Sequence, residues 1–393
     1  MNKMKIKFKY KSLSYQENIF CSCLVYDSVG YSKIGQQKSI GDGKKASVYA
    51  KNGTYDSIGH FKSLTLGSGK VFVNNWNPDK GILDGYEWGI DGKPDNELTW
   101  NNRGNLIKRT LNGIQSTYEY DKLNQLTKEI REGQQKYAWT YDSKGNRLTE
   151  KKDGGAAKGI VCYSKCDLIK NDGKWNYNYD ANGNLIAKGT TATATGTDSV
   201  GSGNFEGWKF EAKGGEVWHY EYDLLNRLIK VSHSKTGTNS LAIVAEYKYD
   251  YRGLIVCRIT GSGASKVTDY FAYDTDGKLI YSEKGTEKHD YIYANGKLWC
   301  EVVTKGNITK TYYHHTDHLG TTICITDSTG KVIWECEHEA FGKVISKKDN
   351  TFTPNFTGKF LDENTGLYYF NARWYDAETG KFITEDPVRD GNN

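Results

Sequence analysis

Proline, methionine and long apolar runs are scarce in this chain. It has 4 prolines and 2 methionines in 393 residues, against about 20 prolines at ordinary usage. No apolar run approaches the roughly 18–20 residues of a membrane-spanning helix, and apolar residues rarely recur at helical spacing. We therefore expect neither a membrane span nor a mainly helical fold.

Excess charge and cofactor motifs are also lacking. Lys and Arg total 53 and Asp and Glu 48, a net charge of +5, so no dense basic face for nucleic acid is expected. Neither Cys21-Ser-Cys23 nor the pair Cys162 and Cys166 has the two-residue gap typical of structural zinc sites. Gly69-Lys70 superficially matches a phosphate loop, but position 64 is Leu and position 71 is Val. The sequence thus predicts no metal and no cofactor.

Tyrosine and glycine are abundant instead. The chain has 29 Tyr and 43 Gly, a composition that favours β-strands joined by glycine-containing turns. Aromatic residues alternate along several segments, as in Tyr137, Trp139 and Tyr141. Alternation places such rings on one face of a strand.

A short motif recurs about every twenty residues. It reads Tyr-Asp, two variable residues, Gly or Asn, and soon afterwards Leu or Ile. The main copies are Tyr120-Asp121, Tyr141-Asp142 with Gly145, Tyr179-Asp180 with Gly183, Tyr222-Asp223, Tyr249-Asp250 with Gly253, and Tyr273-Asp274 with Gly277. Asn124 and Asn226 replace the glycine in two of them, and weaker copies begin at Tyr26, Tyr55, Trp100 and Tyr293. Asp can cap a tight turn through its carboxylate, and Gly or Asn tolerates positive φ.

Each motif therefore predicts one β-hairpin. A single hairpin is marginal in water, so we expect the hairpins to pair into a long sheet that coils or closes, with its tyrosines in cross-strand ladders. The predicted fold is all-β, with an edge strand in 1–19 where Lys alternates with apolar residues, hairpin repeats in 20–310, and a flexible insertion near 190–205 rich in Thr, Gly, Ser and Ala. The third predicted region, 311–393, shows a different pattern.

This C-terminal region contains His-His-Thr-Asp-His-Leu-Gly and Gly-Leu-Tyr-Tyr-Phe-Asn-Ala-Arg-Trp-Tyr-Asp. Together with the repeats, these motifs resemble the Rhs or YD-repeat proteins and their Rhs-associated core domain, which are related to the C component of Tc toxins and to the YD shell of teneurins. The matching residues, expected to be structural, are His314, His315, Asp317, His318, Leu319, Gly320, Gly366, Leu367, Tyr368, Tyr369, Arg373, Tyr375, Asp376, Asp386 and Pro387.

The resemblance implies a non-enzymatic shell of spiralling hairpins in a secreted or cell-surface protein. Its implied partner is a toxin or other cargo polypeptide, either C-terminal or separately encoded. A surface adhesion or glycan-binding module, contacting glycans or proteins of other cells, is the alternative. A third possibility is an aspartyl self-cleaving core, because Arg373, Asp376 and Asp386 fall in the family's self-cleavage neighbourhood. The sequence ends at Asn393, before the family's cleavage segment, so we expect these three residues to be structural.

Three histidines raise the question of a metal site. On a continuous strand His314 and His318 would share one face, and His315 would point away. We expect a hydrogen-bonded core or turn here rather than a metal centre.

Overall fold

The computed structural model describes residues 3–5, 27–31, 36–42, 48–133, 136–163, 167–194, 208–210, 215–235 and 241–387. Within these ranges the only helical element is one 3-10 turn, η1 (Gly263–Ser265). The all-β prediction is therefore confirmed. None of the helical residues in the described ranges forms a helix long and apolar enough to cross a membrane.

The described strands follow each other around two large antiparallel sheets in chain order. The first sheet holds β1 (Lys3–Lys5), β2 (Asp27–Tyr31), β3 (Gln37–Asp42), β4 (Val48–Tyr55), β5 (Phe61–Leu66), β6 (Val71–Trp76), β7 (Leu83–Glu87), β8 (Asn96–Trp100), β9 (Leu106–Leu111), β10 (Ile114–Tyr120), β11 (Leu126–Arg131), β12 (Lys136–Tyr141), β13 (Arg147–Lys152) and β14 (Lys158–Gly159). Every strand pairs with its sequence neighbour, as a chain of hairpins requires.

The second sheet continues directly from the first. It holds β15 (Val161–Cys162), β16 (Ile169–Asn171), β17 (Asn176–Tyr179), β18 (Leu185–Gly189), β21 (Val217–Tyr222), β22 (Leu228–Ser234), β23 (Ala242–Tyr249), β24 (Ile255–Thr260), β25 (Val267–Tyr273), β26 (Leu279–Lys284), β27 (Glu287–Ala294), β28 (Lys297–Lys305), β29 (Ile308–Thr316), β30 (Thr322–Thr326), β31 (Val332–His338) and β32 (Val344–Lys347). Two strands, β19 (Ala192–Ala194) and β20 (Trp208–Phe210), form a separate hairpin. Residues 195–205 of the predicted insertion lie outside the described residues.

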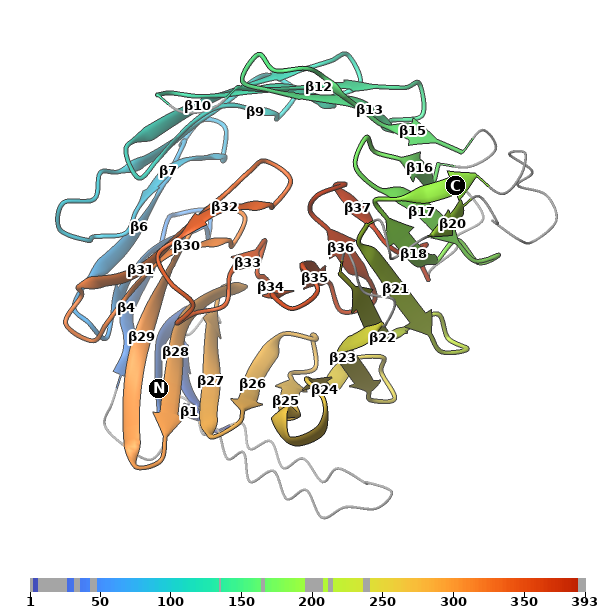
Figure 1. Ribbon diagram of the computed structural model, residues 1–393. Coiled ribbons are helices and arrows are strands. Elements are labelled where there is room, and N and C mark those ends of the chain that lie inside the picture. Colours follow the sequence, from blue (N-terminus) through green and yellow to red (C-terminus); the bar gives the residue numbers. More distant parts are fainter. Residues whose placement is uncertain are drawn as a thin grey trace.

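The two sheets together form a curved wall that coils back on itself, as Figure 1 shows. The last strands return beside the first, and one buried apolar cluster joins the two ends of the wall. Within it the rings of Phe72 and Trp299 lie 4.7 Å apart, edge to face. The Trp88 indole donates a hydrogen bond to the Thr316 carbonyl, at 3.0 Å. Side-chain packing therefore joins the overlapping ends of the coil.

The repeated Asp forms the turn in the same way in hairpin after hairpin. At Asp121, Oδ1 accepts from the backbone N–H of Leu123 and of Gln125, each at 2.9 Å. Asn124, at φ +63°, donates its own N–H to the Asp121 carbonyl. Equivalent turns are built by Asp56, Asp142, Asp180, Asp223, Asp250, Asp274, Asp317 and Asp327. The structure thus confirms the predicted turn, in which the Asp carboxylate caps backbone N–H groups and Asn or Gly has positive φ.

Each of these turns is preceded by a β-bulge, at the motif's aromatic residue or, before Asp317 and Asp327, at the threonine in its place. Tyr120 pairs with Leu126 after the register shifts by one residue. A bulge leaves backbone groups outside the regular ladder. The carbonyl of the residue facing the bulge accepts a hydrogen bond from the motif aromatic of the next hairpin, in the pairs Tyr55 to Gln37, Trp76 to Phe61, Trp100 to Leu83, Tyr120 to Leu106, Tyr141 to Leu126, Tyr222 to Leu185 and Tyr249 to Leu228. The aromatic row therefore links neighbouring hairpins through its hydroxyl and indole N–H groups, a bonding mode that the expected ladder did not include.

Two details differ from the sequence interpretation. The weak copy starting at Tyr26 is not a turn, because Asp27 to Gly30 lie inside β2. The sequence motif changes at 311, but the series of hairpins does not end there, because position 311 lies inside β29. Asp317 then forms another repeat turn, with Thr316 at the position that Tyr has in the other copies. The hairpins continue through Lys347.

Removing one inter-hairpin hydrogen bond tests this wall architecture. Tyr120→Phe deletes the hydroxyl that donates to the Leu106 carbonyl at 2.8 Å. We expect the free energy of unfolding in urea to fall by about 1 kcal/mol, because the carbonyl loses its partner. Tyr251→Phe is the matched control, since Tyr251 is 96% exposed at a turn tip. An equal effect of the two substitutions would contradict the proposed role of the motif tyrosines.

Candidate functional site: the C-terminal segment inside the wall

The end of the chain lies inside the coil that the preceding hairpins form. After β32 the chain forms a small central sheet of β33 (Asn355–Phe356), β34 (Lys359–Asp362), β35 (Leu367–Tyr369), β36 (Trp374–Asp376) and β37 (Lys381–Phe382). Figure 1 shows these strands in the middle, surrounded by the two large sheets. We call residues 355–385 the inner segment.

The wall holds the inner segment through backbone amides that face its bulges. Leu185 donates its N–H to the Ile383 carbonyl at 2.8 Å, and Ile255 donates to the Tyr369 hydroxyl at 3.1 Å. Thr322 donates to Asn355 Oδ1 at 2.9 Å. Each of the three donors is the first residue of a return strand and is paired with the bulged residue of the preceding strand. The irregularity that builds each turn therefore also supplies docking points for the inner segment.

Two carboxylates of the inner segment reach cations of the wall. Asp362 and Asp376 each begin a turn that ends at a glycine four residues later, where the Gly N–H donates to the Asp carbonyl at 2.8 Å. The Asp362 carboxylate then accepts from the Tyr247 hydroxyl at 2.6 Å and lies 3.1 Å from Arg258 Nη1. Asp376 Oδ2 lies 3.1 Å from Lys188 Nζ. Both acids thus cap a turn and bind the wall at once.

The Lys188–Asp376 pair is deeply buried, with side chains 11% and 4% exposed. Burial alone would lower the pKa of Lys188, but the carboxylate of Asp376 raises it. Asp376 therefore faces an ammonium group. In aspartic proteases, by contrast, two carboxylates face each other and share a proton.

The remaining signature residues pack the inner segment against the wall. The hydroxyls of Tyr368 and Tyr375 donate to the carbonyls of Gly342 and Phe341, at 2.7 and 2.8 Å. Leu367 is 1% exposed within an apolar cluster shared with β17 to β24. Arg373 lies 2.9 Å from Asp386 and stacks over the Phe382 ring at 3.8 Å, while Pro387 is exposed. These contacts tie Arg373 to the end of the inner segment.

The three histidines of the signature go to separate partners. His314 bonds Glu301 and Thr322, and His315 bonds Thr326. His318 lies in the turn after β29, edge-on to the Trp100 ring, so the continuous strand that would place it on one face with His314 does not exist. In the described ranges no group of three or more His, Cys, Asp or Glu side chains is arranged so that it could hold a metal ion. Glu301 is held between His289 and His314; burial alone would raise its pKa, but these hydrogen bonds lower it to about 2.

Sequence reasoning missed the wall's half of this site. Lys188 and Arg258 each stand three residues after the first residue of a return strand, Leu185 and Ile255. A basic residue at that place in two repeats was a readable signal. The partners of these two basic residues could not be predicted from the sequence, because Asp376 and Asp362 lie more than a hundred residues away.

The sequence also matches a family model across more than half of its length. The model, described as Teneurin YD-shell, matches residues 95–202 and 279–390. The chain belongs to the teneurin YD-shell family. The second matched range contains the inner segment and the wall strands β27 to β32, while Lys188 falls in the first.

Similar proteins include a bacterial nuclease and a bacterial toxin, both much longer than this YD-shell chain. The tRNA nuclease WapA of Bacillus subtilis is 30% identical over 277 residues, which cover 68% of this chain and 10% of WapA. The double-stranded DNA deaminase toxin A of Burkholderia cenocepacia is 25% identical, over 72% of this chain and 20% of that protein. This chain therefore spans about a tenth to a fifth of their length. A Tc holotoxin pore structure from Photorhabdus luminescens matches 92% of this chain and 22% of its own, with a TM-score of 0.49 and 14% identity.

The buried ion pair gives a direct test of how the inner segment is held. Lys188→Met leaves the Asp376 carboxylate buried without its cation, which costs about 3–5 kcal/mol of unfolding free energy. Lys230→Met is the control, because Lys230 pairs with Glu221 on the exposed side of the wall and should cost less than about 1 kcal/mol. Adding Asp376→Asn to Lys188→Met should recover part of the loss in a double-mutant cycle by urea denaturation. Equal losses at Lys188 and Lys230 would contradict this assignment.

Buried histidines predict a loss of stability in mild acid. Burial lowers the pKa of His315 to about 3, and of His318 and His338 to about 4. Their contribution is complete above the unfolded pKa of about 6.5 and is lost as pH falls, because only the unfolded chain binds these protons. Burial also raises the pKa of Asp290 to about 6, which offsets one of these protons between about pH 6 and 4.

Denaturation between pH 7 and 4.5 measures this effect. Each histidine should contribute about 1.4 kcal/mol per pH unit to the slope of unfolding free energy. His338→Gln should lower the slope by one proton, while Asp290→Asn should raise it. A flat profile in the unmodified protein would contradict the burial of neutral imidazoles.

Proposed function

We propose that this YD-shell chain is a non-enzymatic wall that encloses polypeptide, the closing end of a shell of the kind its toxin relatives suggest. The observation that carries this proposal is the inner segment itself. An extended piece of polypeptide is already held inside the wall, through the amides of Leu185, Ile255 and Thr322 and the cations Lys188 and Arg258.

The volume of the cavity inside the wall fits a segment that closes one end of a shell better than a shell that encloses a folded cargo by itself. A cavity between wall and inner segment measures about 860 Å³, which suits a ligand of drug size and not a folded domain. A larger cargo therefore needs more wall than these strands make. In this proposal the cargo is a toxin-like polypeptide, C-terminal or separately encoded, and the protein acts outside the cell or on its surface.

The self-cleaving and the glycan-binding alternatives have less support. Asp376 is bound to Lys188 and Asp386 to Arg373, so each carboxylate faces a cation. Sugar rings are commonly bound on exposed aromatic side chains, but among the large apolar side chains exposed in the described ranges Tyr251 is the sole aromatic. The geometry therefore favours a structural role.

Limited proteolysis of the full chain tests enclosure. Lys80 and Lys266 stand exposed in loops of the wall, whereas Arg373 and Lys381 belong to the inner segment. We expect trypsin to cut after Lys80 and Lys266 at least about tenfold faster than after Arg373 and Lys381, because cleavage needs a locally open backbone. The rates are measured by mass spectrometry of peptides released over time.

A docking variant completes this experiment. Lys188→Met with Arg258→Met removes both wall cations and should bring cleavage at Arg373 and Lys381 closer to the rate at the exposed loops. Early loss of the inner segment from the unmodified protein would overturn enclosure. A chain whose intact mass is short of 393 residues, restored by Asp376→Asn, would favour self-cleavage, and binding on a glycan array abolished by Tyr251→Ala would favour adhesion.

A further inference from the structure

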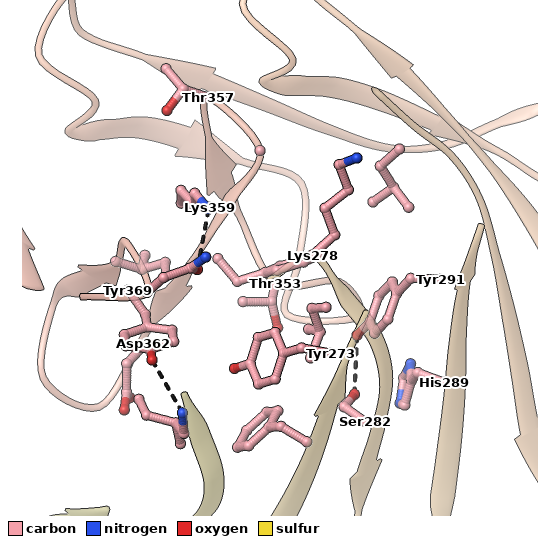
Figure 2. Close-up of a pocket in the computed structure, with 18 of the residues that line it drawn as sticks. Tyr273, Lys278, Ser282, His289, Tyr291, Thr353, Thr357, Lys359, Asp362 and Tyr369 are labelled. Atoms are coloured by element: carbon pink, nitrogen blue, oxygen red, sulfur yellow. Dashed lines mark hydrogen bonds between the residues drawn. The ribbon is translucent and has the colours of Figure 1, made fainter. Parts of the chain in front are cut away.

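The cavity between wall and inner segment has an unusual arrangement of charge. Its lining comes from β23 to β28 and the turn at 318–320 on the wall side, and from the loop at 350–353 and the inner segment on the other. Figure 2 shows Lys278, Lys359 and Thr353 around this space, with Tyr273 and Tyr291 nearby. Lys284 and Lys297 also line it. Four lysines thus border one cavity.

Three of these lysines have only neutral hydrogen-bond partners in the described ranges. Lys284 Nζ donates to the Thr353 hydroxyl at 2.9 Å, and Lys359 Nζ to Asn371 Oδ1 at 3.2 Å. Lys297 Nζ donates to the backbone carbonyl of Asp317 at 3.0 Å. The fourth, Lys278, lies 3.5 Å from Asp276, whose carboxylate is largely exposed.

The acidic groups near the cavity are already engaged. Asp362 binds Arg258 and Tyr247, and Glu301 binds His289 and His314. Glu287 and Glu363 also line the cavity, and they pair with Lys305 and Lys347. The ammonium groups therefore lack counter-charges that the chain itself could readily supply.

Lys284, Lys297 and Lys359 are partly buried, and holding cations partly out of water is unfavourable unless they are paired. Burial lowers the pKa of Lys284, Lys297 and Lys359, and it outweighs the opposing effect of carboxylates such as Glu301 at Lys284 and Asp317 at Lys297. The neighbouring Lys278 lowers the pKa of Lys359 further. Lys278 comes from a wall turn and Lys359 from β34, so the two cations approach from the wall and from the inner segment.

We propose that this cavity binds a small multivalent oxyanion through Lys284, Lys297 and Lys359, with Lys278 at its rim. Phosphate groups and clustered carboxylates share this chemistry, since both accept several charge-assisted hydrogen bonds from ammonium donors. A cavity of about 860 Å³ is large enough for a ligand with two or three such groups. The site does not depend on the enclosure of cargo.

Calorimetric titration of the full chain tests the site with two probes, inorganic pyrophosphate and citrate, at constant ionic strength set with sodium chloride. We expect at least one probe to bind with a Kd below about 1 mM. Tighter pyrophosphate binding identifies a phosphate-type ligand, and tighter citrate binding a carboxylate-type ligand such as an acidic peptide.

Matched lysine variants locate the binding. Lys284→Met and Lys359→Met should each weaken the tighter probe about tenfold, because each removes one charge-assisted bond. Lys310→Met, at an exposed position of β29, should leave the Kd unchanged within about twofold. Equal effects of all three variants, or no binding of either probe below about 1 mM, would overturn the proposal.

Amine labelling of the unmodified protein gives an independent readout if a variant fails to fold. A saturating probe should slow acetylation of Lys284, Lys297 and Lys359 about tenfold, as measured by mass spectrometry, and leave Lys310 unaffected. Uniform labelling with and without the probe would overturn the site.

Discussion

The residue that faces each bulge holds this protein together. Because the bulge shifts the register by one position, the amide and carbonyl of that residue need partners outside the regular ladder. The carbonyl accepts from the motif aromatic of the next hairpin, as Leu106 does from Tyr120. At Leu185, Ile255 and Thr322 the amide donates to the inner segment. The β-bulge of each hairpin therefore provides the hydrogen-bonding groups that link neighbouring hairpins and, at three places, the wall and the inner segment.

This bonding scheme explains a composition rich in tyrosine and poor in aliphatic residues. A thin coiled wall has little volume to fill, but it has many backbone groups to satisfy. Tyr and Trp supply both apolar area and a hydrogen-bond donor, as Tyr141 does with Leu126 and Trp100 with Leu83. The wall is thus built from side chains that pack and donate at once.

Aspartate has a structural role of equal weight. The aspartates of the repeat are turn caps, and Asp362 and Asp376 of the inner segment combine such a turn with an ion pair to the wall. Charge is balanced locally around these two acids. The charges of the cavity lysines Lys284, Lys297 and Lys359 are not balanced in this way, because their hydrogen-bond partners are neutral. This difference is the reason to expect an anionic ligand in the cavity.

The sequence by itself determined the repeating unit, because turn and strand preferences act over a few residues. Tyr-Asp, the Gly or Asn at positive φ and the following Leu predicted the hairpins, and the signature from His314 to Asp386 predicted the family. The neighbours of Lys188, His318 and Lys359 were decided only by the tertiary structure. Their partners lie on distant strands or across a turn, and the curvature of some thirty paired strands, accumulated along the chain, determines which of them meet.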